Sequence, residues 1–305
     1  MGIKSFNNII SKGPGARFPV EKNRYLLYVT FICPYAQRAA IVRQLKGLEE
    51  YLPLAHVNHQ LDSNGWRFAT KEELASVPEG DTRYGTADPL YGFERINQLY
   101  KKASSEYEGR WTVPALWDKK EETIVNNESG EMIRFFNTEF NEVLPEEYSK
   151  IDIYPQELQA QIDKFVESVA DVVAQKAYKT AFAGSEDDFQ DAYSALLEAL
   201  KSADEHLAQS QANGSQYAVG SSVTEADIKL YTSTVRLSQA YYKGYDAKVV
   251  SLARDYPHLH KWLKNLYQIP AFKDTTDFLK LTLGAESRIG HPRSEKFEAV
   301  LDLDK

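Results

Sequence analysis

Cysteine is almost missing from this sequence, because only Cys33 occurs among 305 residues. An intramolecular disulfide is therefore excluded, and so is a zinc site built from several thiolates. A single free cysteine favours a reducing compartment, most simply the cytoplasm. Long hydrophobic runs are missing as well. No apolar stretch approaches the ~20 residues that a membrane-spanning helix needs, so we expect no membrane partner.

Basic residues are in the minority, with 36 Lys and Arg against 44 Asp and Glu and a formal net charge of −8. Because phosphate binding needs a basic surface, we expect no nucleic acid partner. Hydrophobic residues make up 43% of the chain, which is enough for a core and too much for a disordered chain. The composition predicts a soluble globular protein, and we expect no metal cofactor.

The first half of the chain alternates strand-like and helix-like segments. Residues 1–23 lack periodicity and predict an irregular arm. The aromatic and β-branched stretch 24–31 predicts a buried strand, and helical spacing follows from Pro34, which suits a first helical position. The later elements expected are strands at 54–60, 111–117 and 123–126 and helices at 90–103 and 129–140. This β-α-β-α-β-β-α order is typical of a thioredoxin-like α/β domain, here over residues 24–140.

The second half is predicted to be entirely helical. An acidic linker over 141–154 leads to an all-α domain at 155–280, followed by an irregular tail at 281–305. Apolar residues recur at helical spacing through this domain. Thr224 and Asp227 have the spacing of a capping box, in which each side chain satisfies N–H groups at a helix start.

Cys33 is the strongest candidate for chemistry. A lone cysteine is usually a small buried hydrophobic residue, but this one lies between a predicted strand and a helix N-terminus, where a thiolate is favoured. The helix dipole stabilises a thiolate by roughly 0.3–1 kcal/mol, and a backbone N–H such as that of Ala36 adds about 1.5–3 kcal/mol. Pro34 has no N–H to donate. We therefore predict that Cys33 is a nucleophile.

A single nucleophilic thiol needs an external thiol to release any mixed disulfide that it forms, and glutathione is the obvious one. Val113-Pro114 precedes a strand, where a cis bond would turn the Val113 backbone towards a ligand, although an edge-strand proline fits equally well in isolation. Glu128 and Ser129 lie at a helix N-terminus, where they can hold an ammonium and a carboxylate. An ordinary N-cap is the alternative interpretation.

Several segments resemble the glutathionyl-hydroquinone reductases, which are xi-class relatives of the omega glutathione transferases. The active-site segment is Cys33-Pro34-Tyr35-Ala36-Gln37-Arg38. Further matching segments are 45–49, 65–68, 112–119, 124–129, 178–183 and 224–228. The resemblance covers roughly residues 20 to 275. It implies glutathione transferase architecture, with a thioredoxin-like domain followed by an all-α domain, and a homodimer.

The resemblance also implies roles for individual residues. Cys33 would be the nucleophile, and the groups that bind glutathione would be Trp66, Arg110, Val113, Glu128 and Ser129. Without it, Trp66 would be read as core packing and Arg110 as a solvated charge. The family places tyrosines of the helical domain around its aromatic substrate, and Tyr241 matches one of them.

The helical domain departs from the family pattern. Tyr35 stands where the family has tryptophan, and Ala170 and Ala285 align with two of its tyrosines, which implies a larger acceptor cleft. The sequence therefore predicts a cysteine-type glutathione transferase that acts on an aromatic or quinone-like electrophile or its conjugate. The alternatives are an enzyme that tailors a quinone-like secondary metabolite and a non-catalytic carrier of an aromatic ligand.

Overall fold

The structure, a computed structural model, describes residues 4–81, 83–237, 251–289 and 303. The chain divides into two units, Met1–Asp152 and Ile153–Lys305. The division lies inside the segment 141–154 that the sequence marks as a linker. This segment is not wholly irregular, because α5 forms at Glu146–Ser149.

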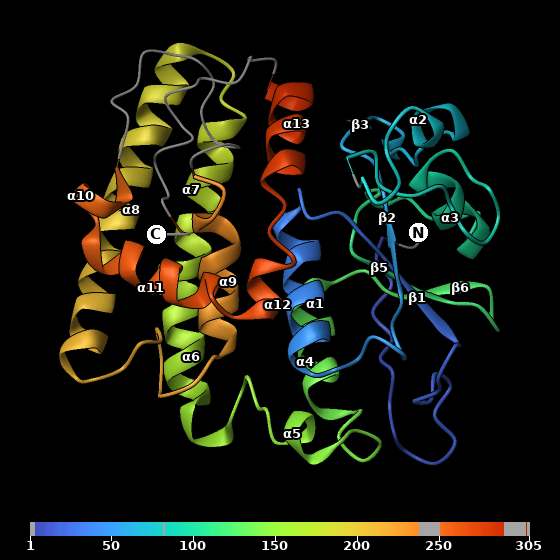
Figure 1. Ribbon diagram of the computed structural model, residues 1–305, viewed down its shortest axis with the longest axis horizontal. Helices are drawn as coiled ribbons and strands as arrows, with labels where there is room; N and C mark the ends of the chain where they lie inside the picture. The colour runs from blue at the N-terminus through green and yellow to red at the C-terminus, as the bar shows by residue number, and fades with distance from the viewer. Residues whose placement is uncertain (1–3, 82, 238–250, 290–302, 304–305) are drawn as a thin grey trace. The chain divides into compact units, whose positions relative to one another are not determined.

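A four-stranded mixed sheet forms the centre of unit 1, in the order β2-β1-β5-β6 (Figure 1). Its strands are β1 Tyr25–Val29, β2 Leu54–His56, β5 Ala115–Asp118 and β6 Thr123–Asn126. Strand β1 pairs parallel with β2 and antiparallel with β5, and all five of its residues are buried. The prediction of a buried strand here is confirmed. The expected strand at 54–60 ends earlier, at His56.

Helices cover both faces of this sheet. Helices α1 (Pro34–Leu45) and α4 (Ser129–Thr138) pack together on one side, and α3 (Ile96–Ala103) lies on the other (Figure 1). The remaining elements of unit 1 are β3 Leu61–Asp62, β4 Gly65–Trp66 and α2 Lys71–Ala75. The predicted order of core elements is thus confirmed. Helix α3 starts six residues later than expected, because the Gln98 side chain accepts the N–H groups of Glu94 and Arg95.

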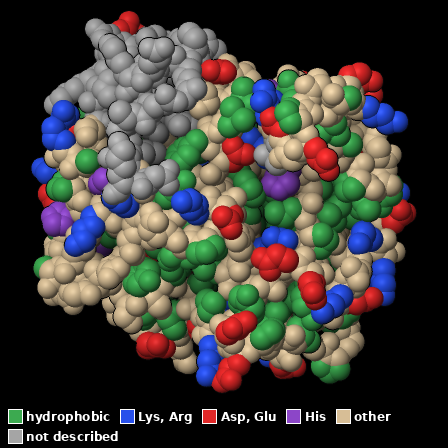
Figure 2. Space-filling view, in the orientation of Figure 1, with side chains coloured by type: hydrophobic (Ala, Val, Ile, Leu, Met, Phe, Trp, Pro, Cys, Tyr) green, Lys and Arg blue, Asp and Glu red, His purple; other side chains and the backbone are tan. Residues whose placement is uncertain are grey.

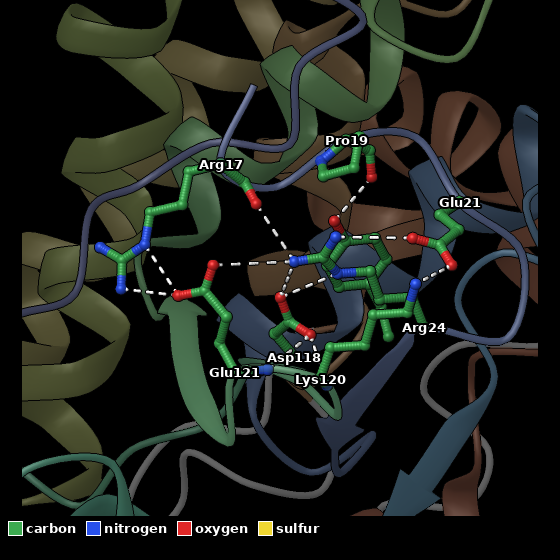
Figure 3. A network of polar contacts seen from close by, with 8 residues as sticks. Arg17, Pro19, Glu21, Arg24, Asp118, Lys120 and Glu121 are labelled. Carbon is green, nitrogen blue, oxygen red and sulfur yellow. Dashed lines mark hydrogen bonds and ion pairs between the residues drawn. The ribbon is translucent and has the colours of Figure 1, made fainter. Parts of the chain in front are cut away.

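A buried ion pair fastens the end of the arm to the sheet (Figure 3). Arg24 donates from Nε to Asp118 Oδ2 over 2.9 Å, and the two side chains are 8% and 0% exposed. Arg24 also donates to the Arg17 carbonyl oxygen at 3.1 Å. Outer ion pairs join Arg17 to Glu121 and Lys120 to Glu21. We call this group the Arg24 latch.

Helices joined by turns and loops make up the described part of unit 2, which contains no strand, as predicted. Its elements are η1 Gln156–Leu158, α6 Gln159–Phe165, the π-helix η2 Val166–Ala170, α7 Asp171–Ala181, α8 Glu186–Ala212, α9 Glu225–Thr234, α10 Leu252–Asp255, α11 Pro257–Tyr267, α12 Pro270–Lys273 and α13 Phe278–Ile289. The capping box of Thr224 and Asp227 is confirmed at the start of α9, and the indole of Trp262 also donates to Asp227.

The expected irregular tail is wrong for residues 281–289, which belong to α13. The side chain of Asp277 accepts the N–H of Lys280 at 3.0 Å, which caps the start of this helix. No helix among the described residues is long and apolar enough to cross a membrane. On the face shown in Figure 2, acidic and basic side chains are interspersed with hydrophobic ones.

Candidate active site

Cys33 is the N-cap residue of α1 and is half-buried. Its Sγ donates to the carbonyl oxygen of Val113 over 3.3 Å. The expected hydrogen bond from the Ala36 N–H to the sulfur is absent, since the Cys33 side chain makes no capping bond. The thiol is directed at a neighbouring strand end instead. As at any helix start, the N–H groups of Tyr35 and Ala36 in the first turn have no intrahelical partner.

The sheet register brings Val113 to the cysteine, although 80 residues separate them in sequence. Tyr28 pairs with Ala115 across the antiparallel β1 and β5, so the residues before β5 lie beside the loop that follows β1. The Val113-Pro114 bond is cis, which confirms that prediction. Val113 itself is buried, and its carbonyl is the group that meets the sulfur.

Glu128 and Ser129 start helix α4, as predicted, with Glu128 as the N-cap residue. In the described part of the chain, the Glu128 carboxylate and the Ser129 hydroxyl make no hydrogen bond or ion pair with another residue. Ser129 is nevertheless buried. The Glu128 side chain is exposed, but the protein around its carboxylate removes enough water to raise its pKa, and the nearby Glu131 carboxylate raises it further. A ligand ammonium placed here would relieve both effects.

Two buried asparagines hold this helix start in place, a role that was not predicted from the sequence. The Oδ1 atom of Asn126 accepts the N–H of Glu128 at 2.7 Å, and its Nδ2 donates to Glu131 at 2.7 Å. Asn127 accepts the N–H of Phe6 at 2.8 Å. The Asn-Asn-Glu-Ser run was the available signal, because two adjacent amides before a helix can satisfy its first N–H groups.

Arg110 lies in an ordered loop with an exposed side chain. Its carbonyl oxygen accepts the Tyr107 hydroxyl at 2.9 Å and the Thr112 N–H at 3.0 Å. Its guanidinium has no partner among the described residues. A fixed backbone with an unpaired cationic side chain suits the capture of an anionic ligand group.

Trp66 is 4% exposed, in β4, so core packing explains most of its surface. It lies near the Arg110 loop, because a β-carbon on Gly65 would come within 2.7 Å of the Trp111 β-carbon. Within the described ranges, no three His, Cys, Asp or Glu side chains lie close enough to hold a metal ion.

The acceptor side is less complete. Tyr241 lies outside the described residues. Ala170 ends the π-helix η2 and is fully buried. Ala285 is half-buried in α13. Tyr35 is 47% exposed on the first turn of α1, with the Arg38 guanidinium 4.8 Å from its ring centre.

The sequence and the fold are both similar to those of known proteins. The glutathione S-transferase N-terminal domain family matches residues 32–139, and its C-terminal domain counterpart matches residues 155–265. Glutathione S-transferase omega-like 2 of Schizosaccharomyces pombe is 38% identical over 86% of this chain and 80% of its own length. Glutathionyl-hydroquinone reductase YqjG of Escherichia coli is 38% identical over 86% of this chain and 74% of its own length. The solved xi glutathione transferase ECM4 from Saccharomyces cerevisiae, in complex with glutathione, matches with a TM-score of 0.84 and 33% identity, over 95% of this chain and 97% of that chain.

Proposed function

This chain belongs to the glutathione S-transferase family, and on that premise we propose that Cys33 exchanges glutathionyl groups with an aromatic acceptor. The chain is a glutathione transferase enzyme, and glutathione is its co-substrate. One observation carries the proposal. The sole thiol faces the Val113 carbonyl, in the same unit as an unpaired carboxylate and hydroxyl at Glu128 and Ser129. These groups suit the two chemically different ends of glutathione.

The binding roles follow from the chemistry of each group. The Glu128 carboxylate holds the ligand ammonium, and the Ser129 hydroxyl with the α4 N–H groups holds the adjacent carboxylate. Val113 offers backbone hydrogen bonds to the ligand peptide, and Arg110 offers a cation to a second carboxylate. Trp66 supports the Arg110 loop. This arrangement leaves the glutathione sulfur free to meet Cys33.

The reaction runs in two steps. The Cys33 thiolate attacks the glutathione sulfur of a glutathionyl–arene thioether, a sulfur–sulfur bond forms, and the carbon–sulfur bond breaks. The arene carbon keeps the electron pair, takes a proton and leaves as the reduced hydroquinone. A second glutathione thiolate then attacks the mixed disulfide. Cys33 is released as thiolate, and oxidised glutathione leaves.

Relatives named glutathionyl-hydroquinone reductases favour a hydroquinone conjugate as substrate. A second candidate keeps the same chemistry but acts on a quinone-like secondary metabolite. The exposed Tyr35 beside the nucleophile, where the family has tryptophan, favours this second acceptor class. We also propose Tyr241 as a hydroxyl donor to the leaving arene, a homodimer, and a cytoplasmic setting in which Cys33 stays reduced.

The test uses the hydroquinone form of glutathionyl-menadione with excess glutathione, followed by mass spectrometry. We expect loss of the conjugate with matching amounts of reduced menadione and oxidised glutathione. Cys33→Ser should react slower by on the order of a thousandfold or more, because a hydroxyl cannot replace the thiolate. Its glutathione affinity should stay near that of the wild type. A Ser variant that works at the parent rate would remove Cys33 from the mechanism.

The carrier alternative makes a different prediction. A carrier needs no activated thiol, so its Cys33 would react slowly with iodoacetamide at pH 6. We expect fast alkylation at that pH and protection by bound glutathione. Slow alkylation without protection, together with tight binding of an aromatic ligand, would favour the carrier.

A further inference from the structure

Residues 4–8 of the N-terminal segment run along the edge of the glutathione-binding groups, and we call them the proximal arm. We propose that the proximal arm is a positioning element: it holds the Glu128 backbone and the Arg110 loop where glutathione needs them. It does so without touching the ligand. The inference rests on the proposed function and assigns a role to a segment that the sequence predicted to be merely irregular.

The arm first acts as an extra strand against the end of β6. Asn7 forms an antiparallel bridge with Asn126. The Asn8 N–H donates to the Val125 carbonyl at 3.0 Å, and the Asn127 N–H donates to the Phe6 carbonyl at 3.0 Å. These bonds join residues more than 115 positions apart. The register of the arm is thus fixed by the residues that immediately precede Glu128.

Side chains then carry this attachment into the site. Asn126 donates from Nδ2 to the Asn8 carbonyl at 2.9 Å while its Oδ1 accepts the Glu128 N–H. Asn126 is completely buried. The Asn126 amide bonds both the arm and the Glu128 backbone. A shift of the arm would therefore break one of these two hydrogen bonds.

A second branch runs from the arm to Arg110. The Phe6 ring stacks on the Tyr107 ring, with centres 5.3 Å apart and planes 18° apart. The Tyr107 hydroxyl donates to the Arg110 carbonyl at 2.9 Å. Gly109 packs tightly here, because a β-carbon at that position would overlap the Lys4 carbonyl oxygen and the Tyr107 hydroxyl. The arm therefore sets the place of the Arg110 backbone.

The first branch starts at Asn8 and the second at Phe6, and each ends at a group proposed to hold glutathione. Within the described residues neither branch reaches Cys33, whose hydrogen bonds are with Thr30, Gln37 and Val113. Disturbing the arm should thus weaken glutathione binding and spare the intrinsic reactivity of the thiol.

Phe6→Ala tests this directly, with Phe18→Ala as the matched control. Both phenylalanines are buried, at 7% and 1% exposure, and both belong to residues 1–23. No hydrogen bond or ring contact joins Phe18 to Tyr107, Arg110 or Glu128 in the described part of the chain. The measurements are the glutathione Kd by calorimetry, Tm, and the rate of Cys33 alkylation without ligand.

Both variants should lower Tm, but only Phe6→Ala should raise Kd, by about tenfold. The alkylation rate should be unchanged in both. Equal changes of Kd in the two variants, or none in Phe6→Ala, would overturn the proposal. A wild-type protein that binds no glutathione would instead refute the proposed function, so the two failures are distinguishable.

Tyr107→Phe keeps the inference testable if Phe6→Ala does not fold. It keeps the ring that stacks on Phe6 and removes the hydroxyl, which donates to the Arg110 carbonyl and accepts from Asn127 Nδ2 at 3.4 Å. We expect the glutathione Kd to rise roughly threefold, because one hydrogen bond to a positioning group is lost. Tm should change little. An unchanged Kd would show that the Arg110 loop does not depend on the arm.

Discussion

Two polar clusters fasten the N-terminal segment to the same sheet, and they differ in what they leave unpaired. In the Arg24 latch, the buried Asp118 carboxylate is met by Arg24 and by the backbone N–H of Lys120 at 2.7 Å. At the start of α4, the buried amides are satisfied as well, but the Glu128 carboxylate and the Ser129 hydroxyl are left without partners in the described residues.

The difference separates stability from function. A closed network of buried charges keeps the fold together, because breaking it leaves a charge without compensation. A cluster that is rigidly held but ends in an unpaired carboxylate is preorganised to bind a ligand. Both clusters are conspicuous in the structure, and only the pattern of unused groups tells them apart. The following predictions are ordered from the largest expected effect to the smallest.

Arg24→Met should lower the free energy of unfolding by roughly 3 kcal/mol, because Asp118 remains fully buried without its cation. Denaturant titration measures this loss. Glutathione affinity, measured on the folded protein, should not change. Arg254→Met removes an exposed ion pair to Asp255 and serves as the control that leaves the midpoint in place. If Arg24→Met lowers the glutathione affinity of the folded protein, the Arg24 latch belongs to the binding site.

Much of this fold could be predicted because its signals are local. The buried run that became β1, Pro34 at the start of α1 and the capping box before α9 each depend on a few neighbouring residues. The tail at 281–289 was misjudged because Asp277, a single capping residue, starts a helix there. The arm was not predictable in this way, because Phe6 contacts Asn127 and Tyr107, each more than 100 positions away.

In the candidate site, too, the features with local sequence signals were predictable and those that depend on distant contacts were not. Cys33, the cis Val113-Pro114 bond and the helix start at Glu128 follow from motifs. The bond from the Cys33 sulfur to the Val113 carbonyl, in place of one from Ala36, could not be predicted, because it depends on how two strands align. Trp66 and Arg110 were assigned by resemblance, since neither residue carries a local signal.

Glu128→Gln should lower the glutathione affinity about ten- to a hundredfold. This loss corresponds to the roughly 1.5–3 kcal/mol of a charge-assisted hydrogen bond. The shape of the side chain and the helix start are preserved. Isothermal calorimetry gives the affinity, and Glu131→Gln is a control that also removes a nearby carboxylate. Equal losses in the two variants would assign the effect to general electrostatics and not to a contact with the ligand ammonium.

Ser129→Ala should lower the glutathione affinity by about two- to tenfold, because it removes one neutral hydrogen bond of about 0.5–1.5 kcal/mol. The α4 N–H groups remain to hold the carboxylate. Tm should change little, since the hydroxyl has no partner within the described residues. A large fall in Tm with unchanged affinity would make Ser129 a structural residue of the helix start.

The smallest expected effect is the pH dependence of binding. Desolvation of the carboxylate and the nearby Glu131 raise the pKa of Glu128, so its carboxyl takes up a proton at a higher pH than an ordinary glutamate does. The ligand ammonium, which stays charged over this range, needs the ionised form. Affinity should therefore decline as the pH falls towards this raised pKa, by no more than severalfold between pH 7.5 and 5.5.

Folding stability should depend on pH in the opposite direction to glutathione affinity, and this difference provides an independent check. A carboxyl whose pKa is raised in the folded state supports folding below its unfolded pKa and loses that support as the pH rises through the folded value. At neutral pH the ionised Glu128 is thus a small burden on the protein without ligand. Glu128→Gln should be slightly more stable than the wild type at pH 7.5, and its weaker glutathione affinity should show no pH dependence in the acidic range. If the wild type and Glu128→Gln lose affinity in parallel as the pH falls, the titrating group lies elsewhere, and the unpaired carboxylate at the start of α4 does not bind the ligand ammonium.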